Sequence, residues 1–182
     1  MIFVYEHTLS GEIEHKKQHE IALSLLKMHF GYLPAIEVRV SGKPYFVNEK
    51  LFFNISHSEK KVVVVISPCE VGIDVQKIRT RMPQVMKRKF HPNEISLIES
   101  EEDFSLIWSI KESFGKCCGK GIQYNSKELD FSALLNSESS NLAGYYFLIK
   151  KHAEYVYCLC AEKEGEVIWK DVPEIKKETN LF

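Results

Sequence analysis

The sequence lacks the features of membrane and secreted proteins. No apolar run approaches the roughly 20 residues that a membrane-spanning helix needs. The apolar start at residues 1–5 is too short for the apolar core of a secretory signal. We therefore expect a cytoplasmic protein without a membrane partner.

An excess of charge of one sign is also lacking. The formal net charge of the 182 residues is -1 at pH 7, so no overall field draws the chain to nucleic acid or to anionic lipid. We expect no nucleic-acid partner on this ground. Any anionic ligand has to be held by a local cluster of positive side chains.

The cysteines form no metal-binding pattern. There are five of them, with Cys117 and Cys118 adjacent and Cys158 and Cys160 inside an apolar run. The odd number and the missing secretory signal are typical of reduced thiols. We expect all five to be small buried apolar side chains rather than disulfides or zinc ligands.

What the sequence does contain is a mixture of helical and strand periodicity. Apolar residues recur at helical spacing over 16–30, and two further helices are predicted at 93–100 and 103–118. Residues 62–66 form a continuous β-branched run, which is typical of a buried strand. After a break at 68–70, residues 71–75 are expected to return beside it as a hairpin. Further strand-like segments are 2–5, 36–40, 51–58, 129–131, 144–151, 155–161 and 167–169.

This order of elements predicts an α+β fold built from two halves. The chain runs strand, helix and strands, then helices, then strands again. We place the boundary after residue 77, which gives an N-terminal half of 1–77 and a C-terminal half of 78–182. No internal repeat is visible in the residues, so any similarity between the halves is expected in structure only.

Two segments carry the side chains best suited to chemistry. Asp74 and Gln76 lie two apart on a predicted strand, so their side chains share a face. Trp108, Glu112 and Lys116 lie four apart on a predicted helix and share a stripe. Two acids from separate elements, with a lysine nearby, suggest a divalent metal beside a phosphate. Taken singly, the aspartate also suits a cap or turn, and Glu112 with Lys116 also suits a surface ion pair.

A third segment, 54–58, reads Asn-Ile-Ser-His-Ser where a strand runs into a loop. Its short donors suit a phosphate oxygen, and His57 can add positive charge. A nucleophilic pair of Ser56 and His57 is the competing interpretation, but adjacent residues point to opposite faces of a strand. Lys43, between a glycine and a proline, either reaches a phosphate or caps a turn.

Six motifs stand in order between residues 42 and 121. They are GKP (42–44), FNISHS (53–58), VGIDV (71–75), FHPNE (90–94), WSIKESFGK (108–116) and GKG (119–121). In this order they closely resemble the 4'-phosphopantetheinyl transferase superfamily, in its Sfp-type (surfactin-synthetase-activating) branch.

The resemblance implies a fold and a reaction. Members fold as a pseudo-dimer of two similar α+β halves. They transfer the phosphopantetheine arm of coenzyme A to a serine of an acyl- or peptidyl-carrier protein, and they release 3',5'-ADP. The carriers serve fatty acid, polyketide or nonribosomal peptide biosynthesis. Because one chain supplies both halves of the site, we expect a monomer.

The resemblance also implies roles for residues at the site. Asp74 and Glu112, joined by Gln76, would bind Mg²⁺ together with the pyrophosphate of coenzyme A, since Mg²⁺ needs only a few protein oxygens beside substrate phosphates. Glu112 would accept the serine proton, and Lys116 would stabilise the leaving phosphate. The family motif has a glutamate where this chain has Gln76, so we expect weaker Mg²⁺ binding.

The coenzyme A site is implied in the same way. Lys43, Ser56 and His57 resemble family positions that contact the phosphates and the nucleotide. The first predicted helix offers Lys16 and Lys17 for the 3'-phosphate, and Glu20 stands about where the family has an arginine.

Some features keep two interpretations. The basic stretch 77–89 either docks an acidic carrier protein or is a solvated face; its candidate docking residues are Arg79, Arg81, Lys87 and Arg88. Glu94 either helps to position the substrate or completes a helix start. For the whole protein, the alternatives are a degenerate homologue that binds coenzyme A or a carrier without catalysis, and a Mg²⁺ phosphohydrolase. The latter would usually have more acidic ligands.

Overall fold

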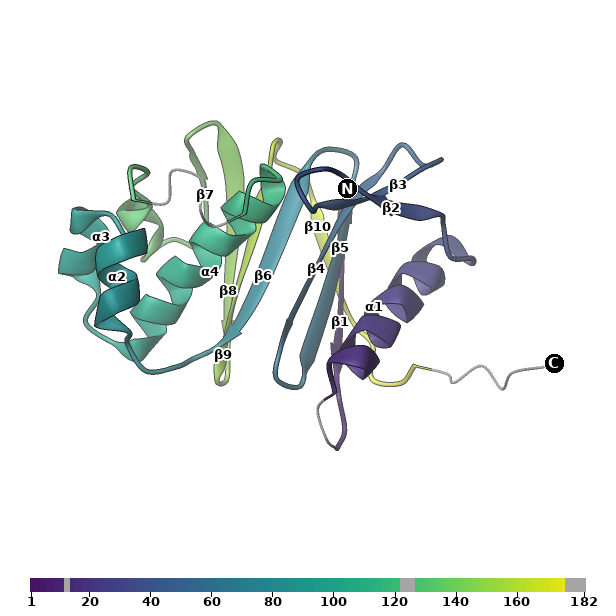
Figure 1. Ribbon diagram of the computed structural model, residues 1–182, viewed down its shortest axis with the longest axis horizontal. Coiled ribbons are helices and arrows are strands. Elements are labelled where there is room, and N and C mark those ends of the chain that lie inside the picture. The colour runs from purple at the N-terminus through teal and green to yellow at the C-terminus, as the bar shows by residue number, and fades with distance from the viewer. Residues whose placement is uncertain (12–13, 122–126, 176–182) are drawn as a thin grey trace.

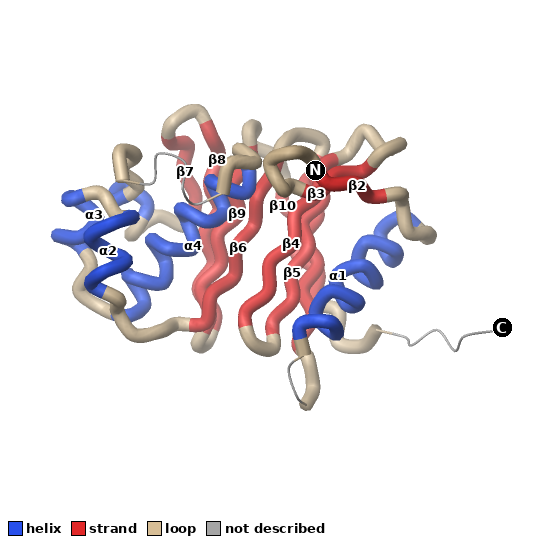
Figure 2. The backbone as a smooth tube through the Cα atoms, viewed as in Figure 1, coloured by secondary structure: helices blue, strands red, loops and turns tan. Residues whose placement is uncertain are grey.

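Two β-sheets pack face to face between helices in the computed structural model of the protein (Figure 1). The structure describes residues 1–11, 14–121 and 127–175. Along the horizontal direction of Figure 2, the layers are helices, sheet, sheet and helix. No helix within these described ranges is both long and apolar enough to cross a membrane.

The first sheet has the strand order β10-β1-β5-β4. Its outer face is covered by helix α1, His15–Phe30, which confirms the helix predicted at 16–30. Successive residues of β5 alternate between the core under α1 and the core between the sheets. Both faces of this strand are buried, and a continuous valine run is therefore required. The strands are β1 (Ile2–Thr8), β4 (Phe52–Ser58), β5 (Lys61–Ser67) and β10 (Val167–Asp171).

The second sheet has the order β6-β9-β8-β7, and helix α4, Glu101–Cys117, packs on its outer face. In β6, Ile73 and Val75 face the core between the sheets. The alternate residues of the same strand face α4, which places Asp74 and Gln76 on one side as predicted. The strands are β6 (Val71–Lys77), β7 (Ser139–Leu142), β8 (Tyr145–His152) and β9 (Tyr155–Ala161).

Smaller elements complete the two ends of the molecule. Strands β2 (Ile36–Val38) and β3 (Pro44–Phe46) form a ribbon beside the first sheet, and its turn contains Gly42 at φ 86°, a conformation that glycine adopts without strain. At the other end lie α2, α3 and the 3₁₀ turn η1 (Figure 1). Their bounds are Pro83–Lys89, Pro92–Leu97 and Ser132–Leu134.

Two sequence predictions of local structure are wrong, and one helix was not predicted. Strands β5 and β6 do not form a hairpin, because β5 pairs with β1 and β4 while β6 pairs with β9 in the other sheet. The segment 129–131 is not a strand and leads into η1. Within the basic stretch, residues 83–89 form helix α2, which has no buried residue and therefore showed no apolar periodicity.

The α+β class is confirmed, and each sheet carries one long helix on its outer face. The pseudo-dimer stays a prediction. The boundary after residue 77 also stays a prediction. Each of the two sheets contains strands from both sides of this boundary. Strand β6 lies in the second sheet, and β10 returns from the C-terminal half to pair in parallel with β1.

Candidate active site

Helix α4 lies unusually close to strand β6, because residue 72 is a glycine. A Cβ atom at Gly72 would be 2.5 Å from the amide nitrogen of Cys117 and still closer to the carbonyl oxygen of Ser113. Glycine is the residue that permits such a backbone approach. The consequence is that the side chain of Lys116, on α4, reaches Asp74, two residues beyond the glycine on β6.

Asp74 is almost completely buried and is surrounded by donors. Its Oδ1 accepts hydrogen bonds from Lys116 Nζ at 2.7 Å and from Ser56 Oγ at 2.9 Å, and its Oδ2 accepts one from Gln76 Nε2 at 3.0 Å. The lysine therefore pairs with an acid across the helix–sheet contact. The alternative of an ion pair with Glu112 along the helix is not observed among the described contacts.

The carboxylate of Glu112 is not surrounded by donors in the way that Asp74 is. This half-buried group makes no hydrogen bond or ion pair with any residue in the described ranges. Burial raises the pKa of this carboxyl, and the negative charge of Asp74 raises it further. Positive charges on Lys116, Arg79 and Lys89 oppose these two effects but do not cancel them.

This donor set is suited to a divalent cation. Two carboxylates repel each other across a partly buried space, and one of them has no partner. In the described part of the chain no three His, Cys, Asp or Glu side chains gather into a metal cluster. A Mg²⁺ ion here would therefore take Asp74 and Glu112, with the amide oxygen of Gln76, and would keep positions for water and substrate phosphates, which is its preferred kind of coordination.

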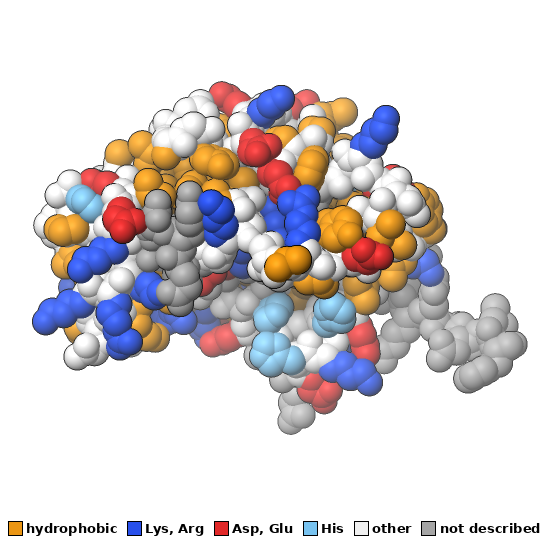
Figure 3. All heavy atoms as spheres, turned by 45° about the horizontal axis from the view of Figure 1, so that its top comes forward, with side chains coloured by type: hydrophobic (Ala, Val, Ile, Leu, Met, Phe, Trp, Pro, Cys, Tyr) orange, Lys and Arg blue, Asp and Glu red, His pale blue; other side chains and the backbone are white. Residues whose placement is uncertain are grey.

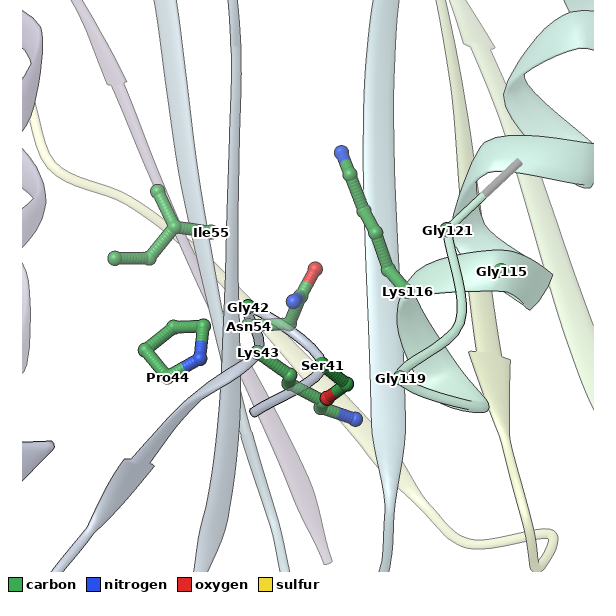
Figure 4. Close-up of a pocket in the computed structure, with 10 residues that line it drawn as sticks. All are labelled: Ser41, Gly42, Lys43, Pro44, Asn54, Ile55, Gly115, Lys116, Gly119 and Gly121. Atoms are coloured by element: carbon green, nitrogen blue, oxygen red, sulfur yellow. The ribbon is translucent and has the colours of Figure 1, made fainter. Parts of the chain in front are cut away.

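A cavity of about 270 Å³ is lined by Lys116, the residue that pairs with Asp74. Figure 4 shows residues 41–44 on one side, residues of the end of α4 and the turn after it on the other, and Asn54 between them. Lys43 lines this cavity, but its ammonium group is buried and points to Glu70 Oε2, the Val71 carbonyl and the Cys117 carbonyl, at 2.6, 3.1 and 2.9 Å. All three donors of the ammonium group are used, so a phosphate contact would have to replace one of them.

His57 is exposed on β4, on the face toward α1, where its ring meets that of His15 at 5.2 Å between centroids. Histidine side chains gather on this face of the molecule (Figure 3). Burial lowers the pKa of His57, and the neighbouring charges of His15, Lys116 and His19 lower it further, while Asp74 raises it. His57 therefore stands within electrostatic reach of Asp74 and Lys116.

The predicted lysines of the first helix lie elsewhere. Lys16 and Lys17 are exposed in the first turns of α1, and neither lines the cavity beside Lys116. Lys17 lines a separate and broader cavity of about 1280 Å³, together with Glu20 on the same helix and Pro173 to Ile175.

Two features behind the site were not predicted. The guanidinium group of Arg79 lies 5.0 Å from the ring centre of Trp108, and its buried Nε has no hydrogen-bond partner. Glu94 completes the start of α3, which was one of its two predicted roles, because its Oε2 accepts from the backbone N–H of His91 at 2.7 Å. What was not predicted is its fully buried ion pair of 2.8 Å with Lys111, which ties α3 to α4 rather than facing a substrate. The sequence signal for this pair was a lysine immediately before Glu112 on the apolar side of the helix.

Comparison with known proteins now identifies the class. The family model of the 4'-phosphopantetheinyl transferase superfamily matches residues 70–168, a range that contains Asp74, Glu112 and Lys116. The chain belongs to this superfamily.

Its relatives support the Sfp-type branch within the superfamily. The chain is 40% identical over 87 residues to the 4'-phosphopantetheinyl transferase gsp of Aneurinibacillus migulanus, covering 44% of this chain and 36% of that protein. It is 36% identical over 92 residues to a 4'-phosphopantetheinyl transferase of Bacillus subtilis, covering 47% and 41%. It is 33% identical over 140 residues to the 4'-phosphopantetheinyl transferase psf-1 of Bacillus pumilus, covering 72% and 57%. The matches thus span between 36 and 57% of the length of these relatives.

Proposed function

We propose that this protein transfers the 4'-phosphopantetheine arm of coenzyme A to a serine of an apo acyl- or peptidyl-carrier protein, with Mg²⁺, and releases 3',5'-ADP. The observation that carries the proposal is the grouping of Asp74 from β6 with Glu112 and Lys116 from α4, where Lys116 also lines a cavity. The family match over residues 70–168 supports the reaction class. We further propose that the protein works as a cytoplasmic monomer.

The proposed metal site consists of Asp74, Glu112 and Gln76. When bound, Mg²⁺ would offset negative charge on the pyrophosphate as the reaction proceeds. Gln76 supplies a neutral oxygen where an acid would supply a charge. In the structure its amide nitrogen donates to Asp74, so its amide oxygen is the atom available to a cation.

Glu112 is the proposed general base. The serine oxygen forms a bond to the phosphorus that carries the pantetheine arm, and the bond from that phosphorus to the bridging oxygen breaks. The serine proton passes to Glu112, directly or through a water that it orients. A half-buried carboxylate with a raised pKa, and with no hydrogen-bond partner among the described residues, suits this role.

Lys116 is the proposed electrophilic group for the leaving 3',5'-ADP. The bridging oxygen departs with its electron pair on the leaving phosphate, and a positive charge there lowers the barrier. Lys116 starts from a contact with Asp74, and its side chain keeps a quarter of its surface exposed. It can therefore turn toward a phosphate in the adjoining cavity.

Coenzyme A is the proposed occupant of the cavity and the surface around it. A volume of about 270 Å³ is below the usual size of ligand pockets, so it would hold only part of so long a molecule. We keep His57 and Lys43 as proposed coenzyme A contacts beside this cavity. We keep Lys16 and Lys17 as more distant candidates for its 3'-phosphate.

The carrier protein is proposed to dock on the basic stretch 77–89. This segment holds six lysines and arginines and no aspartate or glutamate, although the whole chain is nearly neutral. Lysine and arginine side chains gather at the end of the molecule formed by α2 and α3 (Figure 3). Two of them, Arg79 and Lys89, act electrostatically on Glu112. An acidic surface beside the acceptor serine would bring that serine to the base.

Intact-mass spectrometry of apo carrier proteins tests the proposal. After incubation with the protein, coenzyme A and Mg²⁺, we expect a gain of one phosphopantetheine mass. The gain should be lost with EDTA and with the carrier serine changed to alanine. No gain on any of several acyl- and peptidyl-carriers would contradict the proposal.

A degenerate binding protein is the second candidate, and one observation favours it. Lys116 and Gln76 both occupy the oxygens of Asp74 that a metal would use. Calorimetric binding of coenzyme A without any transfer would support this candidate. Transfer to one carrier would exclude it.

A further inference from the structure

The polar side chains of β4 take the place of a hydrogen-bonding strand along one edge of β6. The backbone N–H groups of Ile73, Val75 and Lys77 point away from β9. They donate to the side chains of Asn54, Ser56 and Ser58 at 3.1, 3.2 and 3.0 Å. Three residues spaced by two on β4 thus match three residues spaced by two on β6. This row joins the two sheets at the strand that carries Asp74.

Ser56 makes two further side-chain hydrogen bonds besides the one to the backbone of β6. Its hydroxyl also donates to Asp74 Oδ1 at 2.9 Å and accepts from Lys116 Nζ at 3.1 Å. A serine hydroxyl has one donor and two acceptor positions, and all three are used here. The residue is 4% exposed. No donor is left for a substrate phosphate, which was its expected role.

We infer that Ser56 is a positioning residue that holds the carboxylate of Asp74 in the orientation needed at the active site. One oxygen of Asp74 is held toward Lys116 by Ser56, and the other is left toward Gln76. The inference rests on the proposed function, because it assigns Asp74 to the metal and substrate site. It replaces the coenzyme A contact predicted for Ser56.

The chain offers a matched control in Ser58. Ser56→Ala and Ser58→Ala each remove one acceptor from the row, and each leaves one backbone N–H of β6 without its partner. Only Ser56→Ala also removes the contact with Asp74. Ser56→Thr keeps the hydroxyl and has a side chain that suits a strand.

Calorimetry of Mg²⁺ binding in the presence of coenzyme A, with transfer kinetics beside it, separates the roles. Loss of a residue that orients a metal ligand typically weakens metal affinity or activity by about 10- to 100-fold. We expect a loss of this size in Ser56→Ala, near wild-type values in Ser58→Ala, and recovery in Ser56→Thr. Coenzyme A affinity without metal should be unchanged in all three. Equal behaviour of the two alanine variants would overturn the inference, as would a loss confined to coenzyme A affinity.

Crystal structures of the two alanine variants give a readout that needs neither metal nor transfer. We expect Asp74 to turn away from Lys116 in Ser56→Ala and to stay in place in Ser58→Ala. An unmoved Asp74 in both would overturn the inference. If the wild-type protein modifies no carrier, the proposed function fails, and these structures still decide the role of Ser56.

Discussion

Glu6 and Glu112 are two glutamates in different regions of this molecule, and the environments of their carboxylates differ. Glu6 lies between the two sheets, and Glu112 lies with Asp74 at the contact of α4 and β6. Both Glu6 and Glu112 are withdrawn from water, which alone would raise their pKa values. What separates them is the number of donors that compensate for the lost water.

Glu6 is fully compensated. It accepts from Lys61 Nζ at 2.5 Å, from Tyr157 Oη at 2.8 Å and from Trp169 Nε1 at 2.9 Å, with Lys150 at 3.5 Å. Burial raises its pKa, but these hydrogen bonds outweigh burial and lower the pKa to about 2. The donors come from four strands in both sheets, so Glu6 is a structural junction.

Glu112 is not compensated, and its pKa is raised instead. A fold gains nothing from a buried acid without a partner, because the charged form is disfavoured. The comparison indicates that the charge of Glu6 stabilises the fold, whereas the charge of Glu112 does not and would serve the proposed reaction. Substitutions in the two regions test the two halves of this contrast.

The largest effect on stability is expected for Glu6→Gln. The carboxyl pKa falls from 4.5 to about 2 in the fold, and at about 1.4 kcal/mol per unit this is of the order of 3 kcal/mol. Because the folded pKa is lowered, the contribution is present above the unfolded pKa and is lost as the pH falls toward 2. Urea unfolding should show a large wild-type advantage at pH 7 that shrinks between pH 4.5 and 2.

Glu162→Gln, at an exposed position after β9, is the control for Glu6→Gln and should change little. Transfer per folded molecule should survive the loss of Glu6. An equally stable Glu6→Gln protein would contradict the structural role.

Gly72→Ala should reduce both stability and activity. The added methyl group overlaps the backbone of α4 at Ser113 and Cys117, and overpacking of this kind typically costs about 1–3 kcal/mol. It also pushes Lys116 away from Asp74. Gly165→Ala is the matched control, since a methyl group there would meet only Ile2, at 3.7 Å. Thermal unfolding and transfer assays on both proteins check the prediction. A Gly72→Ala protein with the stability and activity of the wild type would contradict the close helix–strand contact.

The smallest effect is expected for Arg88→Glu on α2. One exposed charge is worth about 0.2–1 kcal/mol, so the KM for the carrier should rise by about 2- to 5-fold at low salt with kcat unchanged. The difference should fade as added salt screens the charges. Lys163→Glu, an exposed reversal outside the basic segment, should leave the KM unchanged. Equal KM changes in both variants would favour a merely solvated face.

Local periodicity predicted much of the fold but not its long-range pairing. The valine run of β5, helix α1 and the face shared by Asp74 and Gln76 followed from spacing alone. The hairpin of β5 with β6 was wrong because β6 pairs with β9, far along the chain, from Val71 with Ala161 to Lys77 with Tyr155. Local periodicity does not show which distant strand a segment pairs with.

The site was predicted by residue type rather than by contact. Glu112 and Asp74 were identified from their spacing, and the structure adds that Glu112 has no hydrogen-bond partner within the ranges it describes. Lys43 and Ser56 were identified from motifs, but their hydrogen bonds are directed into the protein. The sequence shows which side chains can donate hydrogen bonds. Whether each donor is already used depends on the groups that other elements bring next to it.

Glu112→Gln tests the central contrast most directly, with intact-mass transfer assays and urea unfolding on the same preparation. Losing a general base typically costs about 10²–10⁴-fold in rate. Since the folded pKa of Glu112 is raised, its charge disfavours the fold at neutral pH. We therefore predict that transfer to the carrier collapses while stability at pH 7 is unchanged or increases. A variant that transfers at the wild-type rate, or that unfolds as Glu6→Gln is expected to, would contradict the account.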